Sequence, residues 1–356
     1  MARKVKHFSL HRIAGTELRV VSDVDAGILP VIQEEEAVIR GYVESGRWRH
    51  QSVTLFVLQD LQPLVHQLQS DAFPGRADVL DSRPVVNVYD LAEPSACHVF
   101  INLETMTREG YWDDPMSVRG LLAHEHAHPL AEGRTTQASR ELTVETTAEL
   151  PQSSGGRIGA VERPECSGWT EDRQAAIRQA LNLLVHKLCL YAPREIFANE
   201  TAIRSGFGDA LLHLDRRNLA SGQSSVAIRG DIKSHLQREL DRGELTPAAA
   251  KDLLLVGDLQ GYIDLALEVA PFHRGGVESA AQELEATLEN EIFRHLEPEA
   301  RQTYVALVKR YIDLRSDLTR DELRVWGNGI LDVLAGTLAD KGIMSGFRIR
   351  AADTES

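Results

Sequence analysis

The strongest constraint on the fold comes from residues 121–128, which read Leu-Leu-Ala-His-Glu-His-Ala-His and contain the pattern His-Glu-x-x-His. On a helix, residues four apart lie on one face, so the side chains of His124 and His128 can converge on one point. Glu125 then lies beside that point. The pattern therefore requires a helix for the two histidines and a further element that brings another ligand to them.

A helix start precedes the pattern at a suitable distance. Asp114 is a residue type that caps helix N-termini, and Pro115 suits the first helical position. Between this start and the histidines, apolar residues recur on one side of the expected helix: Met116, Val118, Leu121 and Leu122. Local signals that are independent of the histidines therefore place the pattern on a helix.

The same residue types are suited to zinc chemistry. A catalytic zinc site uses three protein ligands and keeps one position open for water. Two ligands would be His124 and His128, and Glu125 would be the general base that takes a proton from the zinc-activated water. We therefore expect a Zn²⁺-dependent hydrolase, with its third ligand on a later helix.

The segment 191–200, Tyr-Ala-Pro-Arg-Glu-Ile-Phe-Ala-Asn-Glu, supplies a candidate. Its Glu-x-Phe-Ala resembles the glutamate helix of gluzincin metallopeptidases, including the lethal-factor-like ones. The form Glu-x-x-Ala-Asn is similar to that of the ImmA/IrrE peptidase family, matched by Glu195, Ala198 and Asn199. The resemblance covers residues 97–205 and implies that Glu195 is the third ligand. It also implies that Asn199 orients a ligand imidazole and that the substrate is a peptide or protein.

Glu200 is the alternative third ligand. Asn199-Glu200 also resembles the start of the thermolysin-type motif, but that family has an acidic residue where this chain has Arg204. Glu195 is favoured on this ground.

Stabilising the oxyanion of the reaction requires a donor besides the metal. Tyr191 resembles the tyrosine found just before the glutamate helix in lethal-factor-like peptidases, which implies a catalytic role for it. His126, Tyr111 and Arg194 are further candidates. The strand expected over residues 98–103 could be an edge strand that pairs with an extended peptide substrate.

The same residues could also form a different kind of metal site. His124, His126 and His128 alternate, so an extended chain would present all three imidazoles on one face, as in a non-peptidase metallohydrolase. Pro129 favours this alternative because proline disfavours helical geometry at the residue before it. The preceding residues 118–123 are not strand-like, which favours the helix. In a helix, Pro129 must kink or end it directly after the second ligand.

The composition limits the partners and the cellular compartment that can be expected for this protein. The 356 residues are 43% hydrophobic and 26% charged, and the net charge is −14, which argues against nucleic-acid and anionic-membrane partners. Three scattered cysteines fit a reducing compartment, although Cys166 could reach the zinc as an inhibitory thiolate. No apolar core follows the basic N-terminus, and the longest apolar stretch, residues 181–192, is interrupted by polar residues. We expect a cytoplasmic protein without membrane segments.

The pattern along the chain predicts an α+β fold. Strands are expected at residues 17–21, 53–58, 84–89 and 98–103, although residues 53–58 could instead open a helix. Helices are expected at residues 28–45, 170–191 and 193–204, with a loop over 151–169. Ser-Gly-Gln-Ser-Ser marks a linker over 218–230, beyond which every segment reads as helical, with starts at Thr246-Pro247 and at the capping box Thr319-x-x-Glu322.

These elements predict a zincin-like metallopeptidase domain over residues 1–216, with a small mixed sheet, an active-site helix and a glutamate helix. A helical C-terminal region over residues 231–356 follows and is a candidate surface for a protein partner. The leading hypothesis is a zinc metallopeptidase. A second hypothesis is a regulatory or binding protein that keeps the zinc site but hydrolyses little, although the intact Glu125 favours the enzyme.

Overall fold

The computed structural model describes residues 4–24, 27–62, 82–90, 94–149, 170–339 and 344–351. The chain divides into two compact units. The first, here the sheet unit, comprises Met1–Ala131 and Ala198–Leu214; the second, the helical unit, comprises Glu132–Phe197 and Asp215–Ser356. This division differs from the predicted boundaries at 216 and 231, because residues 132–197 group with the C-terminal helices rather than with the strands.

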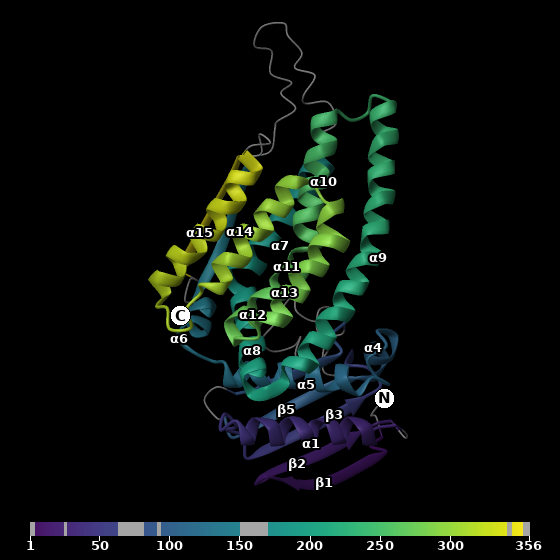
Figure 1. The fold of residues 1–356 in the computed structure, drawn as a ribbon, viewed down its shortest axis with the longest axis vertical. Helices are drawn as coiled ribbons and strands as arrows, with labels where there is room; N and C mark the ends of the chain where they lie inside the picture. Colours follow the sequence, from purple (N-terminus) through teal and green to yellow (C-terminus); the bar gives the residue numbers. More distant parts are fainter. Residues whose placement is uncertain are drawn as a thin grey trace, which may run out of the picture. The chain divides into compact units, whose positions relative to one another are not determined.

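The sheet unit is built on a five-stranded mixed sheet (Figure 1). Its strands stand in the order β1-β2-β3-β5-β4. The pairs β1–β2 and β4–β5 are antiparallel, whereas β2, β3 and β5 run parallel. The strand bounds are β1 His7–Ile13, β2 Thr16–Ser22, β3 Ser52–Leu58, β4 Val85–Tyr89 and β5 Ala96–Asn102.

Alternating apolar residues hold this sheet to helix α1 (Leu29–Glu44), which connects the parallel strands β2 and β3. One face of the strands is buried, at positions such as Leu18, Val20, Leu55 and Val99, because side chains of period two share a face. The four predicted strands and the helix predicted over 28–45 are confirmed to within two residues. The strand β1 was not predicted.

Helix α5 (Pro115–Leu130) carries the His-Glu-x-x-His residues. It follows the short helix α4 (Leu103–Arg108) and begins as predicted, with the Asp114 side chain accepting a hydrogen bond from the backbone N–H of Ser117 at 3.4 Å. It packs on α1, where the buried Tyr42 hydroxyl donates to the carbonyl of Ala123 at 2.6 Å. Pro129 lies in the last turn, so the helix ends directly after the second histidine, as the sequence predicts.

The sheet unit is completed by a second stretch of chain. It contains the end of α8 (Ala192–Ala202), the π-helical turn η3 (Ile203–Phe207) and the start of α9 (Gly208–Asp241). A Cβ atom at Gly120 would lie 2.5 Å from Leu214 Cδ1 and 2.9 Å from the carbonyl oxygen of Ala210. Glycine at position 120 therefore permits the close approach of α5 to α9.

The helical unit consists mainly of short and medium helices. The predicted helix starts are confirmed at Thr170 and Thr246, where each side chain accepts a hydrogen bond from the backbone N–H three residues later. The predicted capping box is confirmed by the reciprocal hydrogen bonds of Thr319 and Glu322. Its elements are α6 (Arg134–Arg140), α7 (Glu171–His186), η2 (Lys187–Tyr191), α10 (Pro247–Gly261), α11 (Ile263–Leu267), α12 (Val269–Gly275), α13 (Glu278–Thr287), η4 (Leu288–Ile292), η5 (Phe293–His295), α14 (Pro298–Ile312) and α15 (Arg320–Ala339). Among them α14 is central and buries the rings of Tyr304 and Tyr311.

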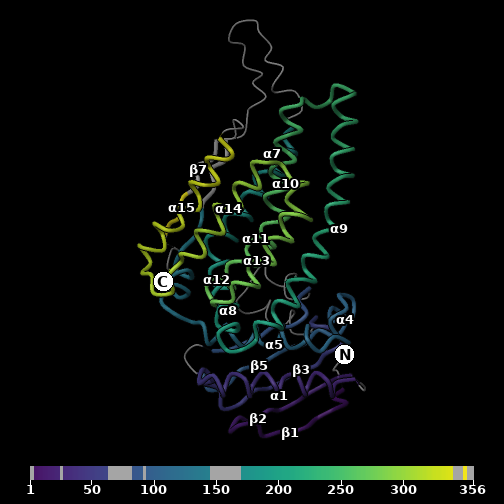
Figure 2. The backbone as a smooth tube through the Cα atoms, viewed as in Figure 1, coloured from purple at the N-terminus to yellow at the C-terminus, as the bar shows by residue number. Residues whose placement is uncertain are grey.

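Two expectations for this region are wrong. The expected linker over 218–230 is the middle of α9, which runs for 34 residues and is unbroken in the backbone trace (Figure 2). Gly222 serves close packing there, since a Cβ atom would lie 2.4 Å from Leu265 Cδ1. The C-terminal region is also not all helical, because β7 (Met344–Ala351) pairs antiparallel with β6 (Leu142–Glu149). The loop expected over 151–169 lies outside the described residues.

Within the described part of the chain, no helix combines the length and the apolar character needed to span a bilayer.

Candidate metal centre

The two motif histidines point their rings at each other. The Nε2 atoms of His124 and His128 lie 3.2 Å apart, because the residues are one turn apart on α5. A tetrahedral zinc ion with Zn–N distances of about 2.0–2.1 Å separates two nitrogen ligands by about 3.3 Å. The spacing of the two nitrogens thus fits a shared tetrahedral ion.

Asn199 fixes the orientation of the first histidine. Its Oδ1 accepts a hydrogen bond from His124 Nδ1 at 2.6 Å. An amide oxygen accepts only, so Nδ1 carries the proton and Nε2 keeps its lone pair for a metal. The family resemblance implies such a contact, between Asn199 and an imidazole of the motif.

Glu125 completes a group of three potential ligand residues. Among the described residues, His124, Glu125 and His128 form a group in which one ligand atom from each lies within 4.8 Å of the others. Glu125 is only 7% exposed. Its Oε2 accepts from the backbone N–H of Asn87 in β4 at 3.0 Å. A carboxylate beside two imidazoles and held by a strand is suited to moving a proton at the site.

His126 points elsewhere and is fully buried. Its Nε2 lies 2.8 Å from Glu35 Oε1 on α1, and its Nδ1 lies 3.9 Å from Cys97 Sγ on β5. Burial opposes the imidazolium, but the Glu35 carboxylate and the Cys97 sulfur outweigh it and raise the pKa of His126 to about 10. The contact between His126 and Glu35 fixes which face of α5 packs against α1.

The three-histidine site on an extended chain is therefore wrong. Residues 115–130 are helical, and the ring of His126 is directed away from those of its two neighbours into the Glu35 contact. The same contact removes His126 from the candidates for oxyanion stabilisation.

The remaining predicted residues lie on α8 and next to it. Glu195 is in the first turn of α8, on the part of the helix that belongs to the helical unit, and Asn199 follows one turn later in the sheet unit. The Oε1 atom of Glu200 accepts from Arg204 Nε at 3.0 Å. Tyr191 ends the π-helical turn η2 and is 41% exposed.

Two further residues that the sequence offered for the site lie outside the group of His124, Glu125 and His128. Tyr111 precedes the N-cap of α5, at the opposite end of that helix from the histidines. Arg194 lies in the first turn of α8, next to Glu195. Cys166 lies outside the described residues.

The edge of the sheet is not the strand that was expected. The strand β5, predicted over 98–103, lies between β3 and β4 and pairs with both, so it is internal. Among the described strands, β4 is the one at this edge, and its Asn87 is hydrogen-bonded to Glu125. Sequence pattern alone could not distinguish the two, because both strands are apolar and β-branched.

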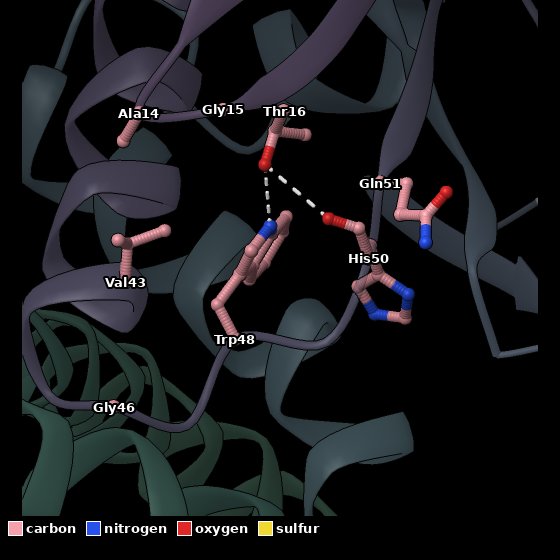
Figure 3. A pocket seen from close by; sticks show the side chains of 8 residues that line it. All are labelled: Ala14, Gly15, Thr16, Val43, Gly46, Trp48, His50 and Gln51. Carbon is pink, nitrogen blue, oxygen red and sulfur yellow. Dashed lines mark hydrogen bonds between the residues drawn. The ribbon is translucent and has the colours of Figure 1, made fainter.

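A separate pocket of about 290 Å³ opens beside the β1–β2 turn (Figure 3). Trp48 Nε1 donates to Thr16 Oγ1 at 2.7 Å, and Thr16 Oγ1 donates to the carbonyl of His50 at 3.3 Å. The Trp48 indole, the Thr16 hydroxyl and the His50 carbonyl are thus hydrogen-bonded to one another, and none of the three grouped residues lines the pocket. Its lining comprises Ala14, Gly15, Thr16, Val43, Gly46, Trp48, His50 and Gln51.

Comparisons of the chain with protein-family models, with curated proteins and with solved structures found no match.

Proposed function

We propose that this protein is a zinc-dependent peptidase in which His124, His128 and Glu195 hold the metal and Glu125 is the general base. The observation that carries the proposal is the convergence of two Nε2 atoms at 3.2 Å, with one imidazole oriented by Asn199. The proposal also rests on the carboxylate of Glu125 beside them. Two converging imidazoles with an adjacent carboxylate are the donor set of a hydrolytic zinc site.

The choice of Glu195 as third ligand rests on the geometry of one helix. In α8, residues four apart share a face, so Glu195 lies on the same side of the helix as Asn199, whose side chain contacts His124. Glu200 is rotated from Asn199 by about 100° and already pairs with Arg204. The helical phase therefore favours Glu195 over Glu200.

The roles of the residues follow from their positions. When bound, zinc supplies Lewis acidity and lowers the pKa of water towards about 7. Glu125 accepts the proton of the attacking water and returns it to the leaving amine, while Asn199 keeps His124 in its ligating tautomer. Tyr191 is proposed to donate to the oxyanion, the role that the resemblance implies.

A peptide is the favoured substrate class because of the edge strand next to Glu125. In an antiparallel pair, alternate residues direct their backbone groups to opposite edges. Asn102 N–H donates to the carbonyl of Pro84, and Asn87 N–H donates to Glu125 rather than to β5. The backbone groups of Asn87 and Tyr89 thus face away from β5. Because the N–H of Asn87 is held by Glu125, an extended peptide would pair with β4 beyond Asn87, where the strand is partly exposed.

The test combines zinc content with cleavage of an unbiased peptide library. We expect about one zinc per chain, lost in His124→Ala and Glu195→Ala but kept in Glu200→Ala, the matched control from the same helix. Glu125→Gln should keep the zinc and lose cleavage by two or more orders of magnitude. Full activity of Glu125→Gln would refute the mechanism, and zinc binding without any cleavage by the unaltered protein would indicate a binding protein instead.

A further inference from the structure

We propose that Asn87 is a positioning residue for Glu125, and that its side chain supplies the donor that Pro129 cannot. The role of Glu125 as base rests on the proposed function; the hold of Asn87 on it rests on the contacts below. Neither Asn87 nor Pro129 belongs to the motif or touches the histidine nitrogens that would bind a metal.

The first step concerns the carbonyl of Glu125. In an α-helix this oxygen accepts from the N–H of the residue four positions later, which is residue 129. Proline has no N–H, so the regular donor four positions later is missing. Asn87 Nδ2 donates to the carbonyl instead, at 3.1 Å. Because a carbonyl oxygen can only accept, the amide atom that faces it is the nitrogen.

The second step concerns the carboxylate of the same residue. The backbone N–H of Asn87 donates to Glu125 Oε2 at 3.0 Å. Asn87 therefore contacts Glu125 at both ends, through its side chain to the backbone and through its backbone to the side chain. Val86 and Val88 cannot replace it, because the alternation of the pair directs their backbone groups towards β5.

The third step concerns what this double contact does. It fixes the strand β4 against the last turn of α5 and, through the strand, the position of the Glu125 carboxylate. The two histidines share that helix, so the base is set relative to them. A misplacement of about 1 Å in a reacting group costs up to about 100-fold in rate. Loss of the Asn87 side chain should therefore lower kcat while leaving KM and zinc content near their original values.

The test uses the chemistry of Pro129 as an internal control. In Asn87→Ala the carbonyl of Glu125 loses the Asn87 donor, and Pro129→Ala restores the helical N–H that can replace it. We expect Asn87→Ala to lower the melting temperature and kcat, the latter about tenfold or more. The double variant should regain the melting temperature but not kcat. Pro129→Ala alone should keep kcat, and Val88→Ala on the same strand should change neither quantity.

A second readout does not depend on activity. In a crystal structure of zinc-loaded Asn87→Ala, the Glu125 carboxylate should leave hydrogen-bonding distance of residue 87 N–H or occupy several rotamers. Recovery of kcat together with stability in the double variant would show that Asn87 only satisfies a carbonyl, and would overturn the proposal. An unmoved carboxylate in Asn87→Ala would do the same, even if the unaltered protein proved to cleave no peptide and the proposed function failed.

Discussion

At the scale of single residues, the candidate site depends on which hydrogen-bonding atoms remain for a ligand. The Asn199 contact fixes the tautomer of His124, and Asn87 supplies the donor that Pro129 lacks. The motif could be predicted from the sequence because its spacing on one helix is local, and the family resemblance implied that Asn199 orients a ligand imidazole. Asn87 could not, because its contact depends on which strand lies at the sheet edge beside α5.

His50 gives a pH dependence at this scale. Burial and the positive charge of His126 lower the pKa of His50 to about 4, while its hydrogen bond to the carbonyl of Pro94 opposes them. The folded pKa lies below the unfolded value of about 6.5, so the unfolded chain takes up the proton more readily. The stabilisation is therefore present above pH 6.5 and is lost as the pH falls towards 4.

We expect His50→Gln, which keeps a donor for Pro94 but does not titrate, to lose less stability over that interval than the unaltered protein. One pKa unit corresponds to about 1.4 kcal/mol. Between pH 7 and 4, the unaltered protein should therefore lose at most about 3 kcal/mol more unfolding free energy than His50→Gln. Urea unfolding at pH 7, 5.5 and 4 measures it. Parallel pH dependences of the two proteins would contradict the assignment.

At the scale of elements, the site is held by close helix packing. The helix α5 approaches α9 at Gly120, where a Cβ atom would lie 2.9 Å from the backbone oxygen of Ala210. A backbone atom cannot rotate away, so α5 would have to shift. We expect Gly120→Ala to destabilise the protein by about 1–3 kcal/mol and, at the proposed metal site, to weaken zinc binding.

Gly208→Ala is the matched control, because a Cβ atom there makes its nearest contact at 3.8 Å with Ile203 Cγ2. Urea unfolding and zinc titration of both variants measure the effect. Equal stability of Gly120→Ala and the unaltered protein would show that α5 and α9 can separate without cost.

The strands and the helix that were predicted in the first 103 residues lie within two residues of their observed bounds, whereas the departures from regular geometry were not predicted. The helix α8 is preceded by the π-helical turn η2 and followed by η3, which contains Gly206 at φ 95°. Each π-turn changes the phase of the chain that follows, and the effect depends on tertiary packing. The Ser-Gly-Gln-Ser-Ser segment was wrongly predicted as a linker for the same reason. It is helical, and Gly222 packs against α11, which is distant in the sequence.

At the scale of the whole molecule, the sequence suggests that residues 231–356 form a separable region. The structure places that cut inside α9, which runs from Gly208 to Asp241. The segment beyond it includes β7, the partner of β6, and Tyr311, whose hydroxyl donates to the carbonyl of Leu188. Residues on both sides of the cut therefore share one core in the helical unit.

We expect a chain that ends at residue 230 to lose the fold of residues 132–197, because α7 and β6 would expose apolar surface that α10 and β7 cover in the full chain. Circular dichroism, limited proteolysis and peptide cleavage of this fragment measure the outcome. Ile349→Ala in the full chain is a milder companion, since Ile349 is buried and its side chain occupies the space that a Cβ atom at Gly327 would need. A protease-resistant fragment with intact cleavage would instead show that the C-terminal helices fold apart from the rest, as the sequence pattern suggests.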